Sequence, residues 1–308
     1  MIEILMSTFN GEPYLEQQVE SILGQAYSDW RLTIRDDGSF DGTVKIVQQY
    51  AHDNPGKIRT LESEGENLGA SLSFARLLDN CEADYVMLSD QDDVWLPDKL
   101  DSTFRKFREM EERYGEKTPL MVFTDATVVD EELNVLAPSM WSYKKSSPDT
   151  VQRLNRILLM NPANGCTMMV NRALLNKALP VPREALMHDA WLVLVAAAFG
   201  KVGYVPKPTL LYRQHGKNES VTKRWGLAHM LGQLRDLRAT RVYIALTRKQ
   251  ACVFLERYQT ALNDVDRKMM YAFAHLDKQS FIGKRVDILR YGFFYVGLIR
   301  NIGWLLIC

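Results

Sequence analysis

The first hundred residues of the chain alternate short apolar runs with segments of helical spacing, and this alternation is the strongest constraint on the fold. In the first helical segment, Leu15, Val19 and Ile22 fall on one helix face. Parallel strands joined by helices are typical of such a pattern, so the sequence predicts an α/β fold with a mostly parallel central sheet flanked by helices. Strands are expected at residues 2–6, 31–34, 58–61 and 85–88, and helices at residues 14–23, 43–50 and 71–78.

Beyond residue 100 the pattern is mixed. Residues 137–150, with Trp141 and Tyr143, are typical of a long surface loop. The two aromatic side chains either stack on a saccharide or belong to an ordinary loop. We therefore expect one domain over residues 1–222, divided near residue 100 into two halves, and a helical extension over residues 223–308. Within the second half a helix is expected at residues 101–114, and strands at residues 120–124, 126–129, 166–170 and 202–205.

Three carboxylates follow the fourth expected strand, in the sequence SDQDDVW. Asp90, Asp92 and Asp93 would repel one another unless a cation or hydrogen-bond donors neutralise them. A divalent ion with oxygen ligands, such as Mg²⁺ or Mn²⁺, does this and commonly shares the phosphate oxygens of a ligand. The alternative is an acidic cap, with Asp93 at the start of the helix that follows Pro97. The position at the carboxyl end of a strand favours a ligand site.

A second acidic segment, RDDGSFDGT, follows the second expected strand. Asp36 and Asp37 are placed to accept hydrogen bonds from a nucleoside base or a ribose, as acidic residues after such strands do. The alternative is a turn in which Gly38 has a positive φ and Ser39 or Asp41 caps the next helix. The two interpretations are compatible, because Asp36 and Asp37 would bind the ligand while the residues after them form the turn and the cap.

Two histidines stand in polar segments of the second half. In MHDAW, His188 and Asp189 open a strongly apolar helix. Asp189 is either the cap of that helix or a general base that takes a proton from a hydroxyl group. In LYRQHG, His215 follows a short strand and is a metal ligand, a phosphate contact or a structural side chain.

Charge and cysteine content restrict the class of protein. A formal net charge of +0 argues against a nucleic-acid-binding protein, which needs a surplus of Lys and Arg on one surface. Residues 223–308 nevertheless hold fifteen Lys and Arg against six Asp and Glu, so the tail is basic and the remainder acidic. The four cysteines lie far apart and match no zinc or disulfide pattern, and the first residues read as a strand rather than a secretion signal. These features indicate reduced thiols in the cytoplasm.

Taken in order, the motifs resemble those of one enzyme family. They are STFNG, RDDGSFDGT, an N-x-G at Asn67 and Gly69, SDQDDVWLPDKL, NGCTMMV, HDAW and LYRQHG. This ordered set resembles the bacterial family 2 glycosyltransferases, which have a GT-A, Rossmann-like fold. Within that family it is most similar to the dTDP-L-rhamnose-dependent rhamnosyltransferases of streptococcal rhamnose polysaccharide biosynthesis. The resemblance spans residues 2–218 and implies a nucleotide-binding half before residue 100 and an acceptor-binding half after it.

The resemblance also implies roles for individual residues. Asp189 matches the catalytic base, and Gly165 lies in the loop that borders donor and acceptor. Asp90 and Asp92 match the metal-binding D-x-D pair, with Asp92 the more direct ligand and Asp90 closer to the ribose of the nucleotide sugar and to the metal-bound waters. His215 matches the histidine that completes the metal or diphosphate site. The remaining contacts to the nucleotide sugar are assigned to Ser7, Thr8, Asn10, Asp36, Asp37 and Asn67.

Two departures from the family pattern qualify the expected reaction. His188 stands where the family usually has Glu, and we interpret the His-Asp pair as a variant of the rhamnosyl branch. The Q-x-x-R-W motif of processive synthases is missing from the sequence, which predicts few additions per encounter. We therefore expect inverting transfer of L-rhamnose from dTDP-L-rhamnose to a lipid-linked or growing cell-surface polysaccharide, with Mg²⁺ or Mn²⁺. The alternatives are a UDP-sugar donor (galactose or N-acetylhexosamine) and, ranked below it, a non-catalytic nucleotide-binding module.

The end of the basic tail joins cations to an apolar run. Lys284, Arg285 and Arg290 precede residues 292–308, which are apolar and aromatic but shorter than the roughly 20 residues of a membrane span. Such a segment is typical of a helix that lies on an anionic membrane surface. We therefore expect a peripheral protein on the inner, cytoplasmic face of the plasma membrane. The alternative is that the apolar residues pack against the first domain or a second subunit of a homodimer.

Overall fold

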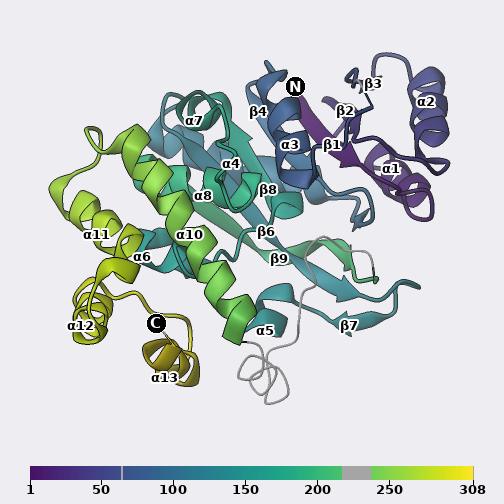
Figure 1. Ribbon diagram of the computed structural model, residues 1–308. Coiled ribbons are helices and arrows are strands. Elements are labelled where there is room, and N and C mark those ends of the chain that lie inside the picture. The colour runs from purple at the N-terminus through teal and green to yellow at the C-terminus, as the bar shows by residue number, and fades with distance from the viewer. Residues whose placement is uncertain (64, 217–236, 308) are drawn as a thin grey trace.

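The computed structural model describes residues 1–63, 65–216 and 237–307, and in these ranges a nine-stranded sheet is covered by helices on both faces (Figure 1). The strand order is β3-β2-β1-β4-β8-β6-β9-β5, and β7 pairs with β6. The pairs with the longest registers, β6 with β9 and β1 with β2, are parallel. The predicted α/β fold with a mostly parallel sheet is thus confirmed. The strands are β1 (Ile2–Thr8), β2 (Trp30–Asp36), β3 (Ile58–Thr60), β4 (Tyr85–Ser89), β5 (Val94–Trp95), β6 (Leu120–Val129), β7 (Val135–Ala137), β8 (Met168–Asn171) and β9 (Lys201–Arg213).

The helices of the first hundred residues also follow the prediction, to within three residues at either end. Beyond them, the two strands expected after residue 120 form the single strand β6. Residues 223–236 of the predicted helical tail lie outside the described residues. The α-helices are α1 (Leu15–Leu23), α2 (Thr43–Asp53), α3 (Ala70–Asp79), α4 (Lys99–Tyr114), α5 (Met140–Lys144), α6 (Leu154–Ile157), α7 (Arg172–Ala178), α8 (His188–Phe199), α10 (Leu237–Tyr258), α11 (Asp264–Ala274), α12 (Phe281–Tyr291) and α13 (Leu298–Ile307). Short 3₁₀ helices are η1 (Pro148–Gln152), η2 (Gly165–Thr167) and η3 (Leu276–Lys278).

The prediction of a long surface loop at residues 137–150 is wrong. This segment forms α5 and the start of η1, and Trp141 is only 8% exposed. Its ring packs edge-on against Phe123 and Tyr204, with ring centroids 5.5 and 5.8 Å away. Burial of Met140 and Trp141 against β6 outweighs the loop-like composition of the segment. Trp141 is therefore a core residue and is not free to stack on a saccharide.

The sheet separates two apolar layers, and alternate residues of each strand face opposite layers. In β1, Leu5 belongs to one layer, whereas Ile4 and Met6 belong to the other. The layer with Leu5 includes α3, α7, α8 and α10, and the other layer includes α1, α2 and α4. Because both faces of the sheet are covered by apolar layers, the polar groups of a site are expected at the strand ends.

Helix α8 is apolar all round because it lies between the sheet and α10 (Figure 1). Trp191 of α8 is fully buried, its indole N–H donates to the carbonyl of Ala178 (2.8 Å), and its ring lies 5.8 Å from that of Phe254 on α10. The helices after residue 237 thus share a core with the sheet. Within the described ranges, no helix combines the length and the apolar character that crossing a membrane requires.

Candidate active site

The polar segments that follow β1, β2 and β4 meet at one edge of the sheet. Thr8 stands opposite Asp36 in the parallel register of β1 and β2, and β4 pairs in parallel with β1 on its other side. The hydroxyl of Ser7 lies 2.5 Å from that of Ser73 on α3. Since ligands of open sheets bind at the carboxyl ends of strands, this edge is the candidate site.

Asp36 organises the turn after β2. Its Oδ2 accepts the backbone N–H groups of Gly38 (3.1 Å) and Ser39 (2.9 Å), and its Oδ1 accepts the hydroxyls of Ser39 (2.6 Å) and Thr8 (2.9 Å). Asn10 joins the same turn through its N–H, which donates to Ser39 Oγ (2.8 Å). Gly38 has φ of +84°, as the turn interpretation predicted. The carboxylate of Asp36 therefore shapes the edge of the site.

Asp37 is buried and connects β2 to the loop before α3. It accepts a hydrogen bond from Arg35 (Nη1 to Oδ1, 2.5 Å) and from the backbone N–H groups of Leu68 (3.0 Å) and Gly69 (2.8 Å). Asn67 is exposed in this loop, and its Oδ1 accepts the N–H of Gly69 (3.1 Å). The buried ion pair and these backbone bonds fix the loop that forms one wall of the site.

The structure brings together Asp92, which precedes β5, and His215, which follows β9. The distance from Asp92 Oδ2 to His215 Nε2 is 2.7 Å, and the imidazole stacks on Tyr14 (4.6 Å between ring centroids, 26° between planes). Burial and the adjacent charge of Asp92 raise the pKa of Asp90 to about 7. Asp93 is buried, and among the described residues nothing donates a hydrogen bond to its Oδ2. Among the described residues, the buried Oδ2 of Asp93 therefore has no donor that would offset its negative charge.

The cluster fits a divalent cation with hard ligands. Carboxylate oxygens and an imidazole nitrogen suit Mg²⁺ or Mn²⁺. Cys166 also lies here, with its Sγ within 4.8 Å of carboxylate oxygens of Asp90 and Asp93. Burial raises the pKa of the Cys166 thiol well above its ordinary value, and a protonated thiol is a poor ligand for hard ions. The alternative that Asp93 caps the following helix is wrong, because α4 begins at Lys99, with Asp98 as its cap residue.

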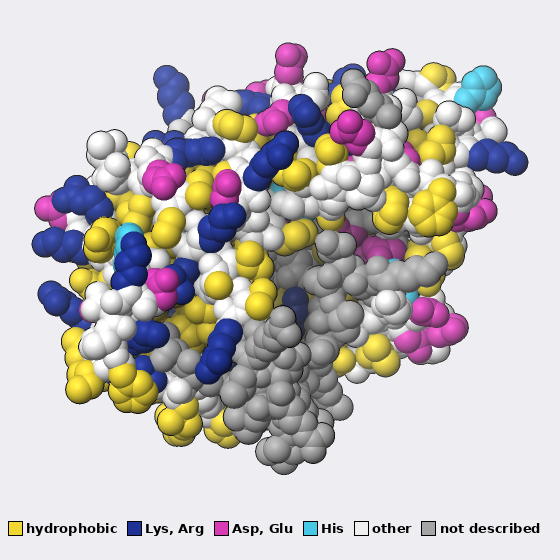
Figure 2. All heavy atoms as spheres, in the orientation of Figure 1, with side chains coloured by type: hydrophobic (Ala, Val, Ile, Leu, Met, Phe, Trp, Pro, Cys, Tyr) yellow, Lys and Arg dark blue, Asp and Glu magenta, His cyan; other side chains and the backbone are white. Residues whose placement is uncertain are grey.

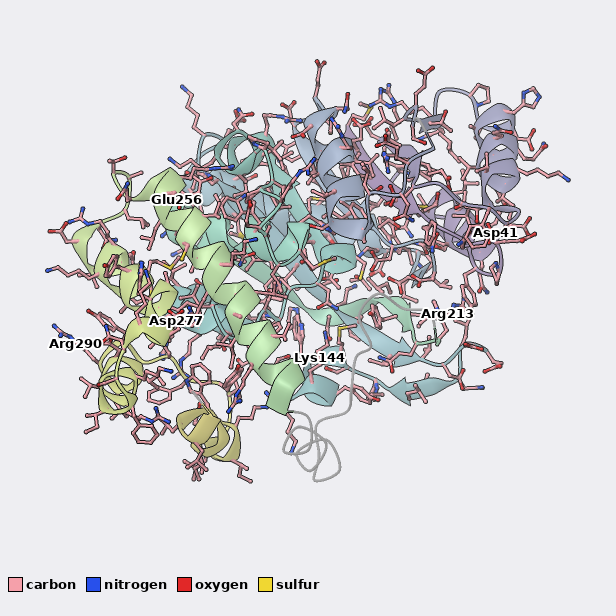
Figure 3. All side chains as sticks on the ribbon, in the orientation of Figure 1. Asp41, Lys144, Arg213, Glu256, Asp277 and Arg290 are labelled. Atoms are coloured by element: carbon pink, nitrogen blue, oxygen red, sulfur yellow. The ribbon has the colours of Figure 1, made fainter. Side chains whose placement is uncertain are left out.

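Two cations lie beside the acidic segment, and one of them, Arg213, bonds to it directly. Arg213 ends β9 (Figure 3), where its backbone N–H donates to Asp93 Oδ1 (3.2 Å) and its Nε donates to the carbonyl of Asp92 (2.8 Å). Lys99 is fully buried and donates to the carbonyl of Cys166 (2.9 Å). Burial lowers the pKa of Lys99 to about 8. Sequence reasoning missed both residues, although both stand within the quoted motifs, SDQDDVWLPDKL and LYRQHG.

Asp189 lies in the first turn of α8 and faces η2. Its Oδ2 accepts the N–H of Gly165 (2.9 Å), and its Oδ1 accepts the N–H of Ala190 (2.5 Å). The alternative that Asp189 caps α8 is wrong, because the helix begins at His188 and Met187 is the cap residue. The carboxylate is instead held at the positive end of the helix dipole. It faces η2, whose Cys166 lies beside Asp90 and Asp93.

His188 is a buried neighbour of the candidate base. Its ring stacks on Phe74 of α3 (4.2 Å between ring centroids, 23° between planes). Within the described ranges neither ring nitrogen has a hydrogen-bond partner, and burial lowers the pKa of the imidazole, which favours the neutral form. A Cβ at Gly165 would lie 3.2 Å from His188 Nε2, so the glycine permits the close approach of η2 to α8.

Two further side chains near Asp189 come from segments without a functional signal in the sequence. Lys144 ends α5 (Figure 3), and its Nζ donates to Asn164 Oδ1 (3.2 Å). On α10, partial burial of Tyr243 and the charge of Asp189 raise the pKa of its hydroxyl to about 12. The sequence predicted a surface loop for the segment of Lys144 and the helical extension for that of Tyr243.

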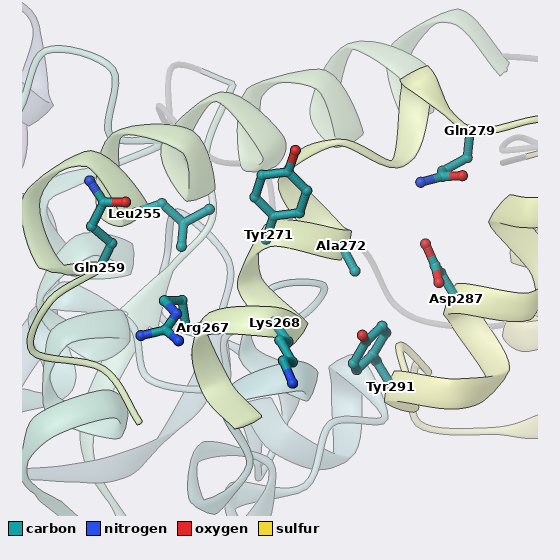
Figure 4. Close-up of a pocket in the computed structure, with 9 residues that line it drawn as sticks. All are labelled: Leu255, Gln259, Arg267, Lys268, Tyr271, Ala272, Gln279, Asp287 and Tyr291. Atoms are coloured by element: carbon teal, nitrogen blue, oxygen red, sulfur yellow. The ribbon is translucent and has the colours of Figure 1, made fainter. Parts of the chain in front are cut away.

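A separate pocket lies between α10, α11 and α12 (Figure 4). Its volume is about 410 Å³, and its wall carries charges of both signs from Arg267, Lys268 and Asp287. Neither the acidic segment nor Asp189 lines it. With one carboxylate in its wall, this pocket lacks the ligand set of a metal centre.

Residues 3–114 match the sequence family described as glycosyl transferase family 2. The dTDP-rhamnosyl transferase RfbG of Shigella flexneri is 29% identical over 229 residues, which cover 70% of this chain and 73% of that protein. The putative teichuronic acid biosynthesis glycosyltransferase TuaG of Bacillus subtilis (strain 168) is 25% identical over 252 residues, which cover 79% of this chain and 93% of that protein. Residues 3–114 thus match the family that the ordered motifs predicted, and the relatives that are similar over most of the chain are bacterial glycosyltransferases.

Solved structures show the same fold. S. aureus TarS 1–349 in complex with UDP-GlcNAc has a TM-score of 0.58 at 15% identity, covering 99% of this chain and 79% of that one. The mannosyltransferase PcManGT from Pyrobaculum calidifontis, in complex with GDP-Man and Mn²⁺, has a TM-score of 0.54 at 13% identity, covering 99% of this chain and 78% of that one. The fold of this chain is therefore GT-A-like, with a helical C-terminal region.

Proposed function

We propose that the protein is an inverting glycosyltransferase that moves L-rhamnose from dTDP-L-rhamnose to a lipid-linked or growing cell-surface saccharide. The observation that carries this proposal is the arrangement around η2. There Gly165 holds the carboxylate of Asp189, and the charge of Asp189 contributes to the raised pKa of Asp90. A base and an acidic cluster suited to a cation therefore lie close together at the carboxyl edge of the sheet, as a direct displacement requires.

In the proposed reaction Asp189 accepts the proton of an acceptor hydroxyl while the oxygen attacks the anomeric carbon of the donor. The bond from that carbon to the diphosphate oxygen breaks, and the diphosphate leaves with the electron pair. The N–H groups of Gly165 and Ala190 orient the carboxylate, which reduces the entropy lost in reaching the reactive geometry. The neutral imidazole of His188 adds no competing charge beside the base.

A divalent cation would be held by Asp90, Asp92 and His215. When bound, such an ion neutralises the charge that develops on a leaving diphosphate. The protein orients these groups through Arg213, which donates to the carbonyl of Asp92, and through Tyr14, on which His215 stacks. The cluster supports the role of a metal, and the Mn²⁺ bound in the mannosyltransferase structure is consistent with it.

We predict that dTDP-L-rhamnose is preferred to UDP-galactose and UDP-N-acetylhexosamines. The support is the ordered motif set and the 29% identity to a dTDP-rhamnosyl transferase. The measurement is kcat/KM for each donor with purified protein, and dTDP-glucose serves as the control that keeps the nucleotide and changes the sugar. A higher kcat/KM with a UDP-sugar would assign the protein to the alternative donor class.

We also propose that α12 and α13 bind the anionic inner face of the plasma membrane. On α13, Leu298, Ile302 and Leu306 share one helix face and are 76%, 52% and 74% exposed, whereas Trp304 is buried on the other side. Figure 2 shows hydrophobic side chains and Lys and Arg gathered over this part of the molecule. Basic residues near anionic lipid contribute about 1 kcal/mol each. The exposed apolar residues of α12 are Phe281, Ile282, Val286 and Leu289, and its basic residues are Lys284, Arg285 and Arg290.

The membrane proposal predicts that wild-type protein sediments with anionic vesicles, and less so at high salt. The triple variant Leu298→Ser, Ile302→Ser, Leu306→Ser should stay in the supernatant, because it loses the apolar burial that an interfacial helix gains. Val135→Ser, at a position 62% exposed on β7, is the matched control and should sediment like wild type. If the triple variant still sediments with vesicles, and is a monomer where the wild type is a dimer, the face is a subunit interface instead.

A further inference from the structure

Lys144 is connected to the candidate base through three consecutive groups. The ammonium donates to Asn164 Oδ1 (3.2 Å), Asn164 precedes Gly165 in the chain, and the N–H of Gly165 donates to Asp189 Oδ2 (2.9 Å). Lys144 belongs to α5, which follows residue 100 and so falls in the acceptor-binding half that the resemblance implies. The ammonium lies close enough to Asp189 for the charge of the carboxylate to act on it.

Among the described residues, Lys144 has few partners for its charge. An ammonium has three N–H donors, and here one of them is accepted by a neutral amide. No carboxylate among the described residues forms an ion pair with it. Burial lowers the pKa of Lys144, and the neighbouring Cys166 and Asp189 oppose this shift. A largely enclosed cation without a close counter-ion is unfavourable unless a ligand supplies the negative charge.

The position of Lys144 is fixed from the opposite side by the C-terminal helix. Arg300 of α13 donates to the carbonyls of Lys144 (2.6 Å) and Lys145 (3.2 Å), which are free of helix bonds at the end of α5. The same helix exposes the apolar face proposed to contact the membrane. Lys144 therefore lies between the base and the side from which a lipid-linked saccharide arrives.

We propose that Lys144 binds an anionic group of the acceptor, a phosphate or a carboxylate, and so positions the saccharide hydroxyl at Asp189. This inference rests on the proposed glycosyl transfer and names the residue that recognises the acceptor. The leaving diphosphate of the donor is assigned instead to the cation that Asp92 and His215 would help to hold. The two anionic groups would then be bound by different residues.

The test compares three acceptors with the same saccharide: a neutral alkyl glycoside, its alkyl diphosphate counterpart and a uronic acid glycoside. In Lys144→Met, kcat/KM for an anionic acceptor should fall about 10- to 100-fold, the value of a lost charge-assisted hydrogen bond. The kcat/KM for the neutral acceptor and the KM for the donor should be unchanged. Whichever anionic acceptor is affected identifies the phosphate or the carboxylate as the ligand. Lys144→Arg should keep the preference, and Lys145→Met, at the exposed neighbour, is the matched control.

Equal losses on the neutral and anionic acceptors, or no loss on any, would overturn the inference, as would an increase in the donor KM alone. If Lys144→Met does not fold, as judged by thermal unfolding, Lys144→Gln takes its place in the same comparison. A wild-type protein that transfers sugar from no donor would contradict the proposed function instead. The two failures are therefore distinguishable.

Discussion

Replacing Asp189 by Asn lowers kcat by about 100- to 10,000-fold, the usual contribution of a general base. Asn keeps the size of the side chain and still accepts the N–H of Gly165, so the loop at η2 retains its position. The donor binds through other residues, and its dissociation constant should stay close to that of wild type. The measurement combines initial rates at saturating donor with calorimetric titration of the donor.

The control for this variant is Asp53→Asn, an exposed carboxylate at the end of α2. It changes the net charge by the same amount and should leave kcat unchanged. A near-normal kcat for Asp189→Asn with bound donor would contradict its role as base. A parallel loss of kcat and donor affinity would show that Asp189 supports the donor site rather than proton transfer.

Removing the cation or its ligand should abolish most of the activity. Chelation with EDTA should reduce turnover to background and added Mg²⁺ or Mn²⁺ should restore it. Asp92→Ala should lose about 100- to 1,000-fold in kcat/KM, because charge neutralisation at a leaving group is worth several kcal/mol. The affinity for dTDP should depend on the cation in wild type and become independent of it in Asp92→Ala.

Asp98→Ala is the matched control for the loss of Asp92. Asp98 follows in the same segment and forms an exposed ion pair with Lys207, which contributes little to stability. Its activity and metal dependence should equal those of wild type. Full turnover in EDTA, or an unchanged metal response in Asp92→Ala, would contradict the assignment of a cation to the acidic cluster.

The sequence predicts the first hundred residues well because local and global signals agree there. Apolar runs of period two, helical spacing and glycine turns all indicate the same alternation of strands and helices, and the acidic segments fall at strand ends. The convergence of Asp92 and His215 was also predictable, but only through the ordered motifs. Their contact depends on the antiparallel pairing of β5 with β9, in which Val94 lies opposite Leu211, and no local pattern specifies this pairing.

The parts that the sequence did not predict depend on tertiary contacts. Trp141 lies in a segment of loop-like composition, and only the neighbouring Phe123 and Tyr204 show that it is buried. Lys144 belongs to the same segment, so its approach to Asp189 had no signal in the sequence. Arg213 and Lys99 stood within recognised motifs, yet their roles follow from hydrogen bonds to distant carbonyl groups, that of Asp92 for Arg213 and that of Cys166 for Lys99. Secondary-structure propensity depends on residues that are neighbours in sequence, whereas these contacts join residues far apart in the chain.

The most direct test of the proposed transfer is product analysis with dTDP-L-rhamnose and a lipid-linked saccharide acceptor. Wild-type protein with Mg²⁺ or Mn²⁺ should release one dTDP for each rhamnose transferred. Nuclear magnetic resonance of the product should show the anomeric configuration opposite to that of the donor, because a single displacement inverts the reacting carbon. Retained configuration, or release of dTDP without a rhamnosylated product in the presence of acceptor, would contradict the account.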